Sequence, residues 1–329
     1  MFHDADLVGM YSRAMIEYMA FLYLRCLSFE QIRSIMRAWF GDDVVSKHTL
    51  LNHVEEIADS VPEHLAVTKW LKPRRSGYYA LDGTYMHYRG EEFVLLILLD
   101  VETLDVVAYA VTKEETEASY QALIDSVNDE ISGGIKGFFC DGELGLLRSL
   151  RLTYPGIPVQ LCVFHKYSRV GQVACFVRPK TEMDREIKRR VELVLFAPTK
   201  QEAIEALHNL QRYAREHQSS QKLRQVIGVL KRNFDLLLTH YDHPEMSPYN
   251  NILEGFNYLI KRRTNLMKGL KKAANVHRWM KLLILDWRFH PLTDSAFKRR
   301  RGNSPLELAL CDLPKFPNWI SYVRKKYKK

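Results

Sequence analysis

One acidic residue within a β-prone segment places the strongest constraint on how this chain can fold. Residues 77–89 have the sequence GYYALDGTYMHYR, in which apolar and aromatic residues lead to Asp82, an Asp-Gly step follows, and β-prone residues continue. A carboxylate in such a run is costly to bury unless it is paired, hydrogen-bonded or bound to a metal ion. The fold must therefore bring partners to Asp82 from elsewhere in the chain.

Length and composition indicate a folded protein without disulfides or a membrane span. The 329 residues allow two or three domains, and the 47% hydrophobic and 26% charged content is typical of globular proteins. No apolar run approaches the roughly 18 uncharged residues that a spanning helix needs. The N-terminus lacks the basic region and apolar core of a signal peptide, and five irregularly spaced cysteines argue against a disulfide framework.

Positive charge is concentrated in the last quarter of the chain. Residues 257–329 contain 19 Lys and Arg against 4 Asp and Glu, a net charge of +15, whereas the preceding residues carry −6. This asymmetry favours a polyanionic partner, of which nucleic acid is the commonest. The alternative is a solvated basic tail that only improves solubility.

The N-terminal region is predicted to be helical. Two segments with apolar residues at helical spacing follow the N-cap candidates Ser28 and Ser46, and Gly41-Asp42-Asp43 separates them. Two short helices joined by such a turn fit a helix-turn-helix, although any small helical hairpin would show the same pattern. In a helix-turn-helix the second helix would present polar side chains outward to the major groove of DNA. These side chains are Lys47, His48, Thr49, Asn52 and His53.

After a basic linker expected at residues 67–77, the periodicity becomes that of β-strands. The segments from residue 78 to 164 follow the order β-β-β-α-β-α-β, and the apolar run 93–99 is long enough for a central strand. A short buried strand at 135–140 leads directly into Asp141, and a strand at 158–164 ends at His165. Ligands of mixed α/β sheets gather beyond strand ends, where Asp141 lies.

The rest of the chain is predicted to be mostly helical. Residues 181–240 have a helical apolar pattern, which indicates an all-α insertion, and an amphipathic helix begins at Asn251. At about 100° per residue, its apolar residues share one side, and Glu254, Asn257 and Lys261 share the other. Taken alone, these three residues are an ordinary solvated helix face.

Together, Asp82, Asp141 and Glu254 are candidates for a metal site. Each aspartate follows a β-prone run and precedes a glycine, and the glutamate projects from a firmly packed helix. Hard carboxylate oxygens suit Mg²⁺ or Mn²⁺, which bind through a few carboxylates and substrate phosphate. Two such ions about 4 Å apart can activate water or a 3′-hydroxyl and stabilise the leaving oxygen of a phosphodiester.

Five motifs, in this order, resemble those of the Mutator-like DDE transposases of bacterial and archaeal insertion sequences. They are LDGTY around Asp82, EASY at 117–120, FFCDGELGL around Asp141, YPGIPVQLCVFHK at 154–166 and NILEGFNYLIKRRT around Glu254. They span roughly residues 77–290. A helical segment between the second Asp and the Glu, with the sequence APTKQEAIEAL, also resembles the family. One departure is Leu161, where the family has a basic residue.

The resemblance implies an RNase H-like core, an α/β fold with a mixed five-stranded sheet and flanking helices. It also implies that Asp82, Asp141 and Glu254 are catalytic and bind two Mg²⁺ or Mn²⁺ ions. Cys162 and His165 are implied to lie near the active site, where we also place Asn257 and Lys261 from the helix face. A Cys-x-x-His pair could otherwise be half of a zinc site, but no second Cys/His pair lies close in sequence. Cys162 could also be a small buried hydrophobe, and His165 a capped core histidine.

We therefore expect five regions. They are a helical region with the DNA-binding helix-turn-helix (1–75), the first part of the catalytic core (76–175), the all-α insertion (176–245), the last part of the core with the Glu helix (246–292) and a basic C-terminal tail (293–329).

The expected function is that of an insertion-sequence transposase, which cuts DNA and joins the freed 3′-hydroxyl to target DNA. It would bind terminal inverted repeats through the helix-turn-helix and C-terminal basic residues, and act as at least a dimer. These basic residues are Arg262, Arg263, Lys298, Arg299, Arg300 and Arg301. The alternatives are an inactive or domesticated descendant that only binds DNA, and an RNase H-like nuclease that hydrolyses without joining. The compact length and the lack of an obvious nuclear signal beyond short basic runs favour a prokaryotic host and a cytoplasmic, nucleoid-associated protein.

Overall fold

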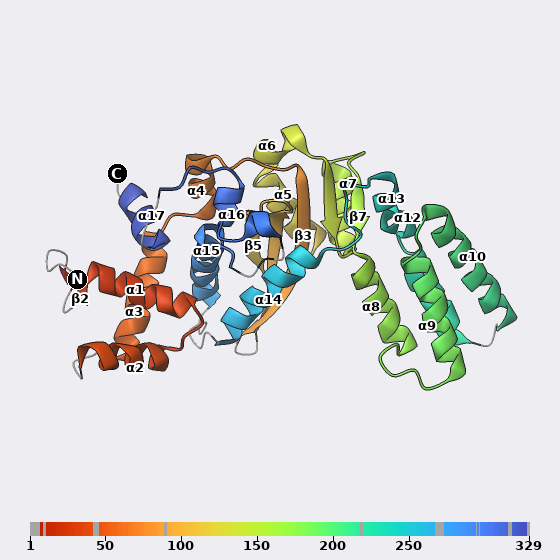
Figure 1. Ribbon diagram of the computed structural model, residues 1–329, viewed down its shortest axis with the longest axis horizontal. Helices are drawn as coiled ribbons and strands as arrows, with labels where there is room; N and C mark the ends of the chain where they lie inside the picture. The colour runs from red at the N-terminus through yellow and green to blue at the C-terminus, as the bar shows by residue number, and fades with distance from the viewer. Residues whose placement is uncertain are drawn as a thin grey trace.

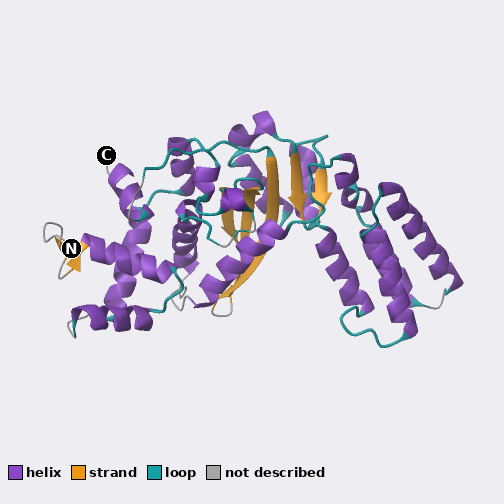
Figure 2. Ribbon diagram, viewed as in Figure 1, coloured by secondary structure: helices purple, strands orange, loops and turns teal. Residues whose placement is uncertain are grey.

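A mixed five-stranded sheet lies at the centre of an elongated molecule, and helices cover it (Figure 1, Figure 2). The computed structural model describes residues 7–8, 11–41, 46–88, 91–217, 220–266, 273–293, 295, 297–314 and 318–327. The strand order is β5-β4-β3-β6-β7, with antiparallel pairing from β5 to β3 and parallel pairing from β3 to β7. The predicted mixed α/β sheet with flanking helices is therefore confirmed.

The strands are β1 (Leu7–Val8), β2 (Tyr11–Ser12), β3 (Tyr78–Tyr88), β4 (Glu91–Asp100), β5 (Val106–Thr112), β6 (Gly137–Cys140) and β7 (Val159–Leu161). The helices of the first half are α1 (Arg13–Leu24), α2 (Phe29–Phe40), α3 (Lys47–Ser60), α4 (His64–Leu71), α5 (Glu117–Asp125), α6 (Asn128–Ile131), η2 (Ser132–Gly134), α7 (Leu144–Thr153) and α8 (Val163–Ala174). Those of the second half are α9 (Glu182–Leu195), α10 (Lys200–Glu216), α11 (Gln221–Lys231), α12 (Phe234–Leu237), α13 (Thr239–Asp242), α14 (Asn251–Leu266), α15 (Ala273–Phe289), η3 (Lys298–Arg300), α16 (Pro305–Leu308) and α17 (Trp319–Tyr327).

Strand β4 is apolar along most of its length because both faces of the sheet are covered. Leu95 and Ile97 belong to a core shared with the N-terminal helices, α14 and α15. Leu96 and Leu98 belong to a second core, shared with α5, α7 and the helices from α8 to α11. A strand covered on both sides favours a continuous hydrophobic run over alternation, which explains the predicted central strand.

The Asp-Gly step does not form a turn. Strand β3 continues through Asp82 and Gly83, which pair in unbroken antiparallel register with Ile97 and Leu96 of β4. The β-prone residues before and after this step therefore belong to one strand of 11 residues. Pairing with β4 satisfies the backbone N–H and C=O groups at this step. Only the Asp82 carboxylate therefore needs partners from elsewhere in the chain.

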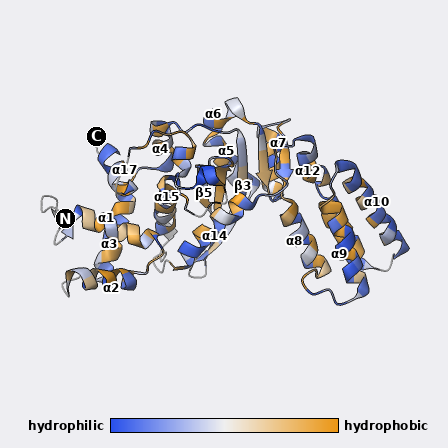
Figure 3. Ribbon diagram, in the orientation of Figure 1, coloured by the Kyte–Doolittle hydropathy of each residue, from blue (hydrophilic) through white to orange (hydrophobic). Residues whose placement is uncertain are grey.

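The last strand of the sheet is shorter than expected. Strand β7 ends at Leu161, and Cys162 precedes α8, so that His165 lies in the first turn of this helix and not at a strand end. Helices α9, α10 and α11 follow and extend away from the sheet at the right of Figure 1. Figure 3 shows apolar and polar residues on α8 and α9, consistent with packing among these helices.

The N-terminal helices and the C-terminal segment pack on each other. Ser28 and Ser46 cap α2 and α3 as predicted, whereas residues 42–45 of the expected turn lie outside the described residues. The basic tail expected at 293–329 is wrong for its described part, because Trp319 and Ile320 of α17 are buried in the core. The linker expected at 67–77 is also partly wrong, since its first residues belong to α4.

No helix in the described part of the chain has both the length and the apolar character needed to cross a membrane.

A buried ionic network holds the N-terminal helices, α15 and the sheet together. The Asp105 carboxylate accepts hydrogen bonds from Arg288 Nε at 2.7 Å and Nη2 at 2.9 Å, and from Arg75 Nη1 at 2.7 Å. Arg288 also donates to the His64 carbonyl oxygen and to Thr68 Oγ1 of α4, both at 2.9 Å. The side chains of Asp105 and Arg288 are both 0% exposed, so each charge depends on the other for compensation.

We expect Asp105→Asn to destabilise the protein by about 3–5 kcal/mol, because Arg288 and Arg75 would lose their buried counter-charge. Urea unfolding followed by circular dichroism measures the change. Glu182→Gln is the control, since Glu182 is 85% exposed in its pair with Arg185 and its loss leaves no buried charge. Equal unfolding midpoints for Asp105→Asn and the control would contradict this role of the network.

Candidate active site

Asp82 and Asp141 lie at the same level of two neighbouring parallel strands. The register pairs Tyr79 with Phe138 and Ala80 with Phe139, so each aspartate stands two residues beyond the last pair. Neighbouring strands are roughly 4.8 Å apart, which brings the two positions side by side. The next pair of strands continues this level, because Cys140 pairs with Leu161 and Cys162 follows. Asp82, Asp141 and Cys162, which belong to the sequence motifs, therefore lie at the same edge of the sheet, where β6 and β7 end beside β3.

Each aspartate is held by hydrogen bonds. Asn257 of α14 donates from Nδ2 to Asp82 Oδ2 at 2.7 Å, and the Gly83 N–H donates to Asp82 Oδ1 at 2.9 Å. The Glu143 N–H donates to Asp141 Oδ1 at 3.0 Å. Asn257 was predicted to lie near the site, and it ties α14 to β3 at the aspartate itself.

The electrostatics of the pair are unfavourable without a cation. Burial, followed by the negative charge of Asp141, raises the pKa of Asp82 to about 7, although His165 opposes the shift. A raised pKa means that the folded protein resists ionising this carboxyl. Two carboxylates in this arrangement call for positive charge, which a divalent cation supplies.

Glu115 is a further acidic residue near the site that the sequence patterns did not identify. Its carboxylate accepts a hydrogen bond from the Tyr120 hydroxyl, and burial raises its pKa although the hydroxyls of Tyr120 and Tyr85 oppose the shift. A Cβ atom at Gly83 would lie only 2.5 Å from Glu115 Oε1, so a glycine is needed beside it. The glycine after Asp82 was the only signal of this close approach in the sequence.

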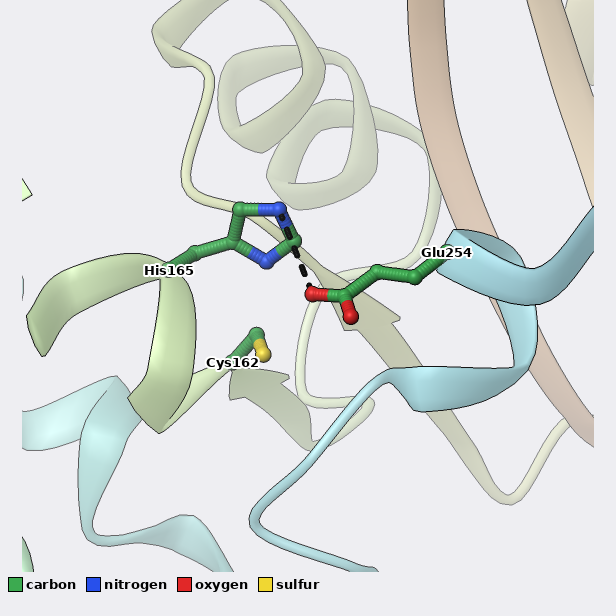
Figure 4. A group of neighbouring side chains, drawn as sticks. All are labelled: Cys162, His165 and Glu254. Atoms are coloured by element: carbon green, nitrogen blue, oxygen red, sulfur yellow. Dashed lines mark ion pairs between the residues drawn. The ribbon is translucent and has the colours of Figure 1, made fainter. Parts of the chain in front are cut away.

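Glu254 lies beside His165 and Cys162, as Figure 4 shows. Its Oε1 is 3.8 Å from His165 Nε2, and ligand atoms of the three residues lie within 4.8 Å of one another. Among the described residues, this group meets that spacing for metal ligands, whereas Asp82, Asp141 and Glu254 as a set do not. The structure thus brings the two aspartates together and places Glu254 on the histidine side of them.

Charge interactions link the two halves of the site. The pKa of His165 is raised to about 9, chiefly by the adjacent Cys162 thiol and further by Asp141 and Asp82, against the effect of burial. Burial raises the pKa of the Cys162 thiol, but His165 and the backbone N–H groups of His165 and Asn250 outweigh it and leave the pKa lowered. His165 therefore interacts electrostatically with the two aspartates and also lies beside Glu254.

The loop before α14 fixes the distance between α14 and α8. The Val163 N–H at the start of α8 donates to the Pro248 carbonyl oxygen at 3.0 Å. The Asn250 N–H donates to Cys162 Sγ at 3.4 Å. These bonds join the first turns of both helices, and Glu254 and His165 project from those turns.

The basic residues near α14 have different surroundings. Lys261 and Arg262 are exposed, whereas the Arg263 side chain is 16% exposed and lies 3.9 Å from Asp286. Farther along, Lys298 and Arg299 are exposed. Arg300 is half-buried and donates to the Val101 carbonyl oxygen at 3.1 Å, whereas Arg301 is exposed and donates to the Ser295 carbonyl oxygen at 2.7 Å.

The predicted groove-facing residues of α3 are only partly available. Lys47, His48 and Asn52 are exposed, and Lys47 forms an ion pair with Glu30. Thr49 is half-buried, with its hydroxyl 3.0 Å from Ser46 Oγ at the N-cap. The His53 side chain is 15% exposed and lies against Tyr11, so the expectation that it faces outward is wrong.

The raised pKa of Asp82 predicts a stability that depends on pH. The folded protein keeps this proton up to about pH 7, whereas an unfolded chain releases it near the ordinary value of 3.8. The stabilisation from this group is therefore complete below the ordinary value and is lost as the pH rises through about 7.

In metal-free buffer with EDTA, we expect Asp82→Asn to raise the melting temperature relative to the parent protein above pH 7. This advantage should shrink towards pH 4, where the parent carboxyl is protonated in both states. Melting curves at several pH values measure the difference, with Glu182→Gln as the control. An advantage that does not change with pH would contradict the raised pKa.

Comparison with known proteins identifies the family. The family model described as "Transposase, Mutator family" matches residues 3–289. A transposase for insertion sequence element IS905 from Lactococcus lactis subsp. lactis (strain IL1403) is 26% identical over 219 residues. That match covers 64% of this chain and 53% of the relative, so the chain spans about half the length of that relative.

Two solved structures show weaker similarity. The catalytic core domain of HTLV-2 integrase in complex with magnesium has 13% identity and a TM-score of 0.23, and the match covers 37% of this chain and 86% of that chain. A simian T-cell lymphotropic virus intasome in complex with PP2A regulatory subunit B56 gamma has 12% identity and a TM-score of 0.24, with 55% and 66% covered. Such low TM-scores carry no weight for this chain. From the family match over nearly its whole length, this chain belongs to the Mutator family of transposases.

Proposed function

We propose that this protein is a DDE transposase that cuts DNA at the ends of an insertion sequence and joins the freed 3′-hydroxyl to target DNA. Family membership supports the transposase activity. One observation carries the catalytic assignment: Asp82 and Asp141 stand at the same level of adjacent strands, and burial and the neighbouring charge raise the pKa of Asp82. Glu254, on the helix that hydrogen-bonds Asp82, completes the proposed triad.

The donor set fits Mg²⁺ or Mn²⁺. Asp82 and Asp141 offer hard carboxylate oxygens, and their mutual repulsion is relieved by a divalent cation. When bound, two such ions would activate water or a 3′-hydroxyl and stabilise the leaving oxygen. Asp82, Asp141 and Glu254 would hold them.

The surrounding residues would orient these ligands. Asn257 and the Gly83 N–H fix the two oxygens of Asp82, and the Glu143 N–H fixes one oxygen of Asp141. The His165 imidazole, 3.8 Å from the Glu254 carboxylate, would attract this carboxylate on the other side of the site. Lys261 lies on the same exposed side of α14, where an ammonium group would lie beside DNA phosphate. We propose that Glu115, held by Tyr120, adds to the negative potential that attracts the ions.

We propose that the N-terminal helices recognise the sequence of the DNA ends. Helices α2 and α3 form a capped helix pair, and the exposed residues at the start of α3 are Lys47, His48 and Asn52. A recognition helix in the major groove contacts base edges through its N-terminal residues. The exposed basic residues Arg262, Lys298 and Arg299 would add phosphate contacts. Because two ends react together, the active complex would contain at least two copies.

The catalytic proposal is tested on a supercoiled plasmid that carries the DNA flanking the gene on both sides. With Mg²⁺ the protein should nick and join this DNA, and Asp82→Asn, Asp141→Asn and Glu254→Gln should each abolish both products. The control is Glu205→Gln, an exposed carboxylate on α10. Cleavage by Asp82→Asn at the rate of the control would refute the metal assignment.

The same assay distinguishes the alternative functions. A nuclease would give nicked DNA without joined products. An inactive descendant would bind the ends in EDTA and give no product with Mg²⁺ or Mn²⁺.

DNA binding has a separate test. We expect Asn52→Ala to weaken binding to end DNA by about tenfold, the effect of losing one base contact worth about 1–3 kcal/mol, and to leave binding to unrelated DNA unchanged. Lys47→Ala should weaken binding to both, since a phosphate contact is independent of sequence. Fluorescence anisotropy at fixed salt measures both, with Asn209→Ala, an exposed asparagine of α10, as the control. Equal effects of Asn52→Ala and Asn209→Ala would refute base recognition by α3.

A further inference from the structure

Cys162, His165 and Glu254 form a group whose chemistry differs from that of the aspartate pair. The group contains one thiol, one imidazole and one carboxylate, with ligand atoms within 4.8 Å of one another (Figure 4). Thiol sulfur and imidazole nitrogen favour softer ions such as Zn²⁺, whereas Mg²⁺ and Mn²⁺ prefer oxygen. A site for the catalytic ions alone would not need the sulfur.

The backbone holds the three side chains in place. Cys162 and His165 are three residues apart at the start of α8, which directs both side chains from the same first turn. Glu254 projects from the first turn of α14, and the bonds from Val163 to Pro248 and from Asn250 to Cys162 join the two turns. A ligand set that spans two helices is thereby fixed from both sides.

His165 also has an unsatisfied atom. Its Nε2 faces Glu254 at 3.8 Å, beyond hydrogen-bond distance. Its Nδ1 is buried and makes no hydrogen bond of good geometry among the described residues, although the adjacent Cys162 thiol interacts with the ring. A buried ring nitrogen without a partner is costly, and coordination of an ion removes that cost.

We propose that Cys162, His165 and Glu254 form a second metal site, which binds Zn²⁺ through three protein ligands and leaves a fourth position for water. Three protein ligands with one open position are a common arrangement for zinc. The Cys162 thiol releases its proton on binding, since the thiolate is the ligand.

This site shares Glu254 with the proposed catalytic triad. Zn²⁺ bound to Cys162 and His165 would keep the Glu254 carboxylate away from Asp82 and Asp141, and so inhibit the reaction that depends on Mg²⁺. Binding of zinc is independent of the proposed function, whereas the inhibition rests on it.

Co²⁺ is the probe for binding, because a cobalt–thiolate bond gives a charge-transfer absorption that oxygen ligands do not. Titration of the purified, reduced full-length protein should produce this band with one equivalent of Co²⁺. Zn²⁺ should abolish the band, and excess Mg²⁺ should not. Cys162→Ser should lose the band, and His165→Gln and Glu254→Gln should weaken cobalt binding at least tenfold.

Cys175→Ser is the matched control, because Cys175 is an exposed cysteine at the end of the same helix. Its variant should keep the band in full. Absence of the band in the parent protein, or an equal band in Cys162→Ser, would overturn the proposal. Circular dichroism spectra confirm that each variant is folded.

The inhibition has its own experiment. Cleavage with Mg²⁺ should fall on addition of one equivalent of Zn²⁺, and each variant is compared with its own zinc-free rate. Cys175→Ser should be inhibited like the parent protein. A cobalt band without any Mg²⁺-dependent cleavage would count against the proposed function and leave the metal site standing. Mg²⁺-dependent cleavage without a cobalt band would support the proposed function and overturn the metal site.

Discussion

Repulsion between two carboxylates at the same level of adjacent strands is the constraint around which the site is arranged. Asp82 and Asp141 meet because β3 and β6 run parallel and in register. Their hydrogen bonds to Asn257, Gly83 and Glu143 hold their oxygens without neutralising them. The nearby positive charge of His165 opposes the rise in the pKa of Asp82 only in part, since that pKa remains at about 7. A cation beside such a pair would favour its ionised form.

Helix α14 connects the aspartate pair to the hydrophobic core. Asn257 links it to β3, while Phe256 and Ile260 anchor it in the core shared with α15 and the N-terminal helices. The Arg288–Asp105 pair fixes α15 against α4 and the end of the β4–β5 turn. A change in the packing of the N-terminal helices could therefore shift α14 and, through Asn257, change the orientation of the Asp82 side chain.

Patterns within single segments predicted much of this arrangement. The β-prone runs, the N-caps at Ser28 and Ser46 and the amphipathic helix at Asn251 follow from local sequence, because each depends on neighbours within a few residues. Contacts between distant segments were not predictable in this way. Glu115 can lie close to Asp82 because Gly83 lacks a side chain, and the local sequence pattern does not reveal this contact between distant residues. The C-terminal segment was expected to be a basic tail because of its charge, but the large apolar residues of its described part, such as Trp319 and Ile320, are buried in the core.

The position of Glu254 has a simple physical basis. Its helix is fixed at Asp82 by Asn257, three residues further along, so the backbone at Glu254 cannot move far while that bond holds. A change in the position of its carboxylate therefore comes mainly from rotation of one partly exposed side chain. In this structure the Glu254 carboxylate lies on the side of the imidazole, with its Oε1 3.8 Å from His165 Nε2. On the proposals above, hard cations at the aspartates would attract Glu254 towards them, and Zn²⁺ at Cys162 would hold it beside His165. Under these two proposals, the chemical nature of the ion would decide which side of the site holds the third carboxylate.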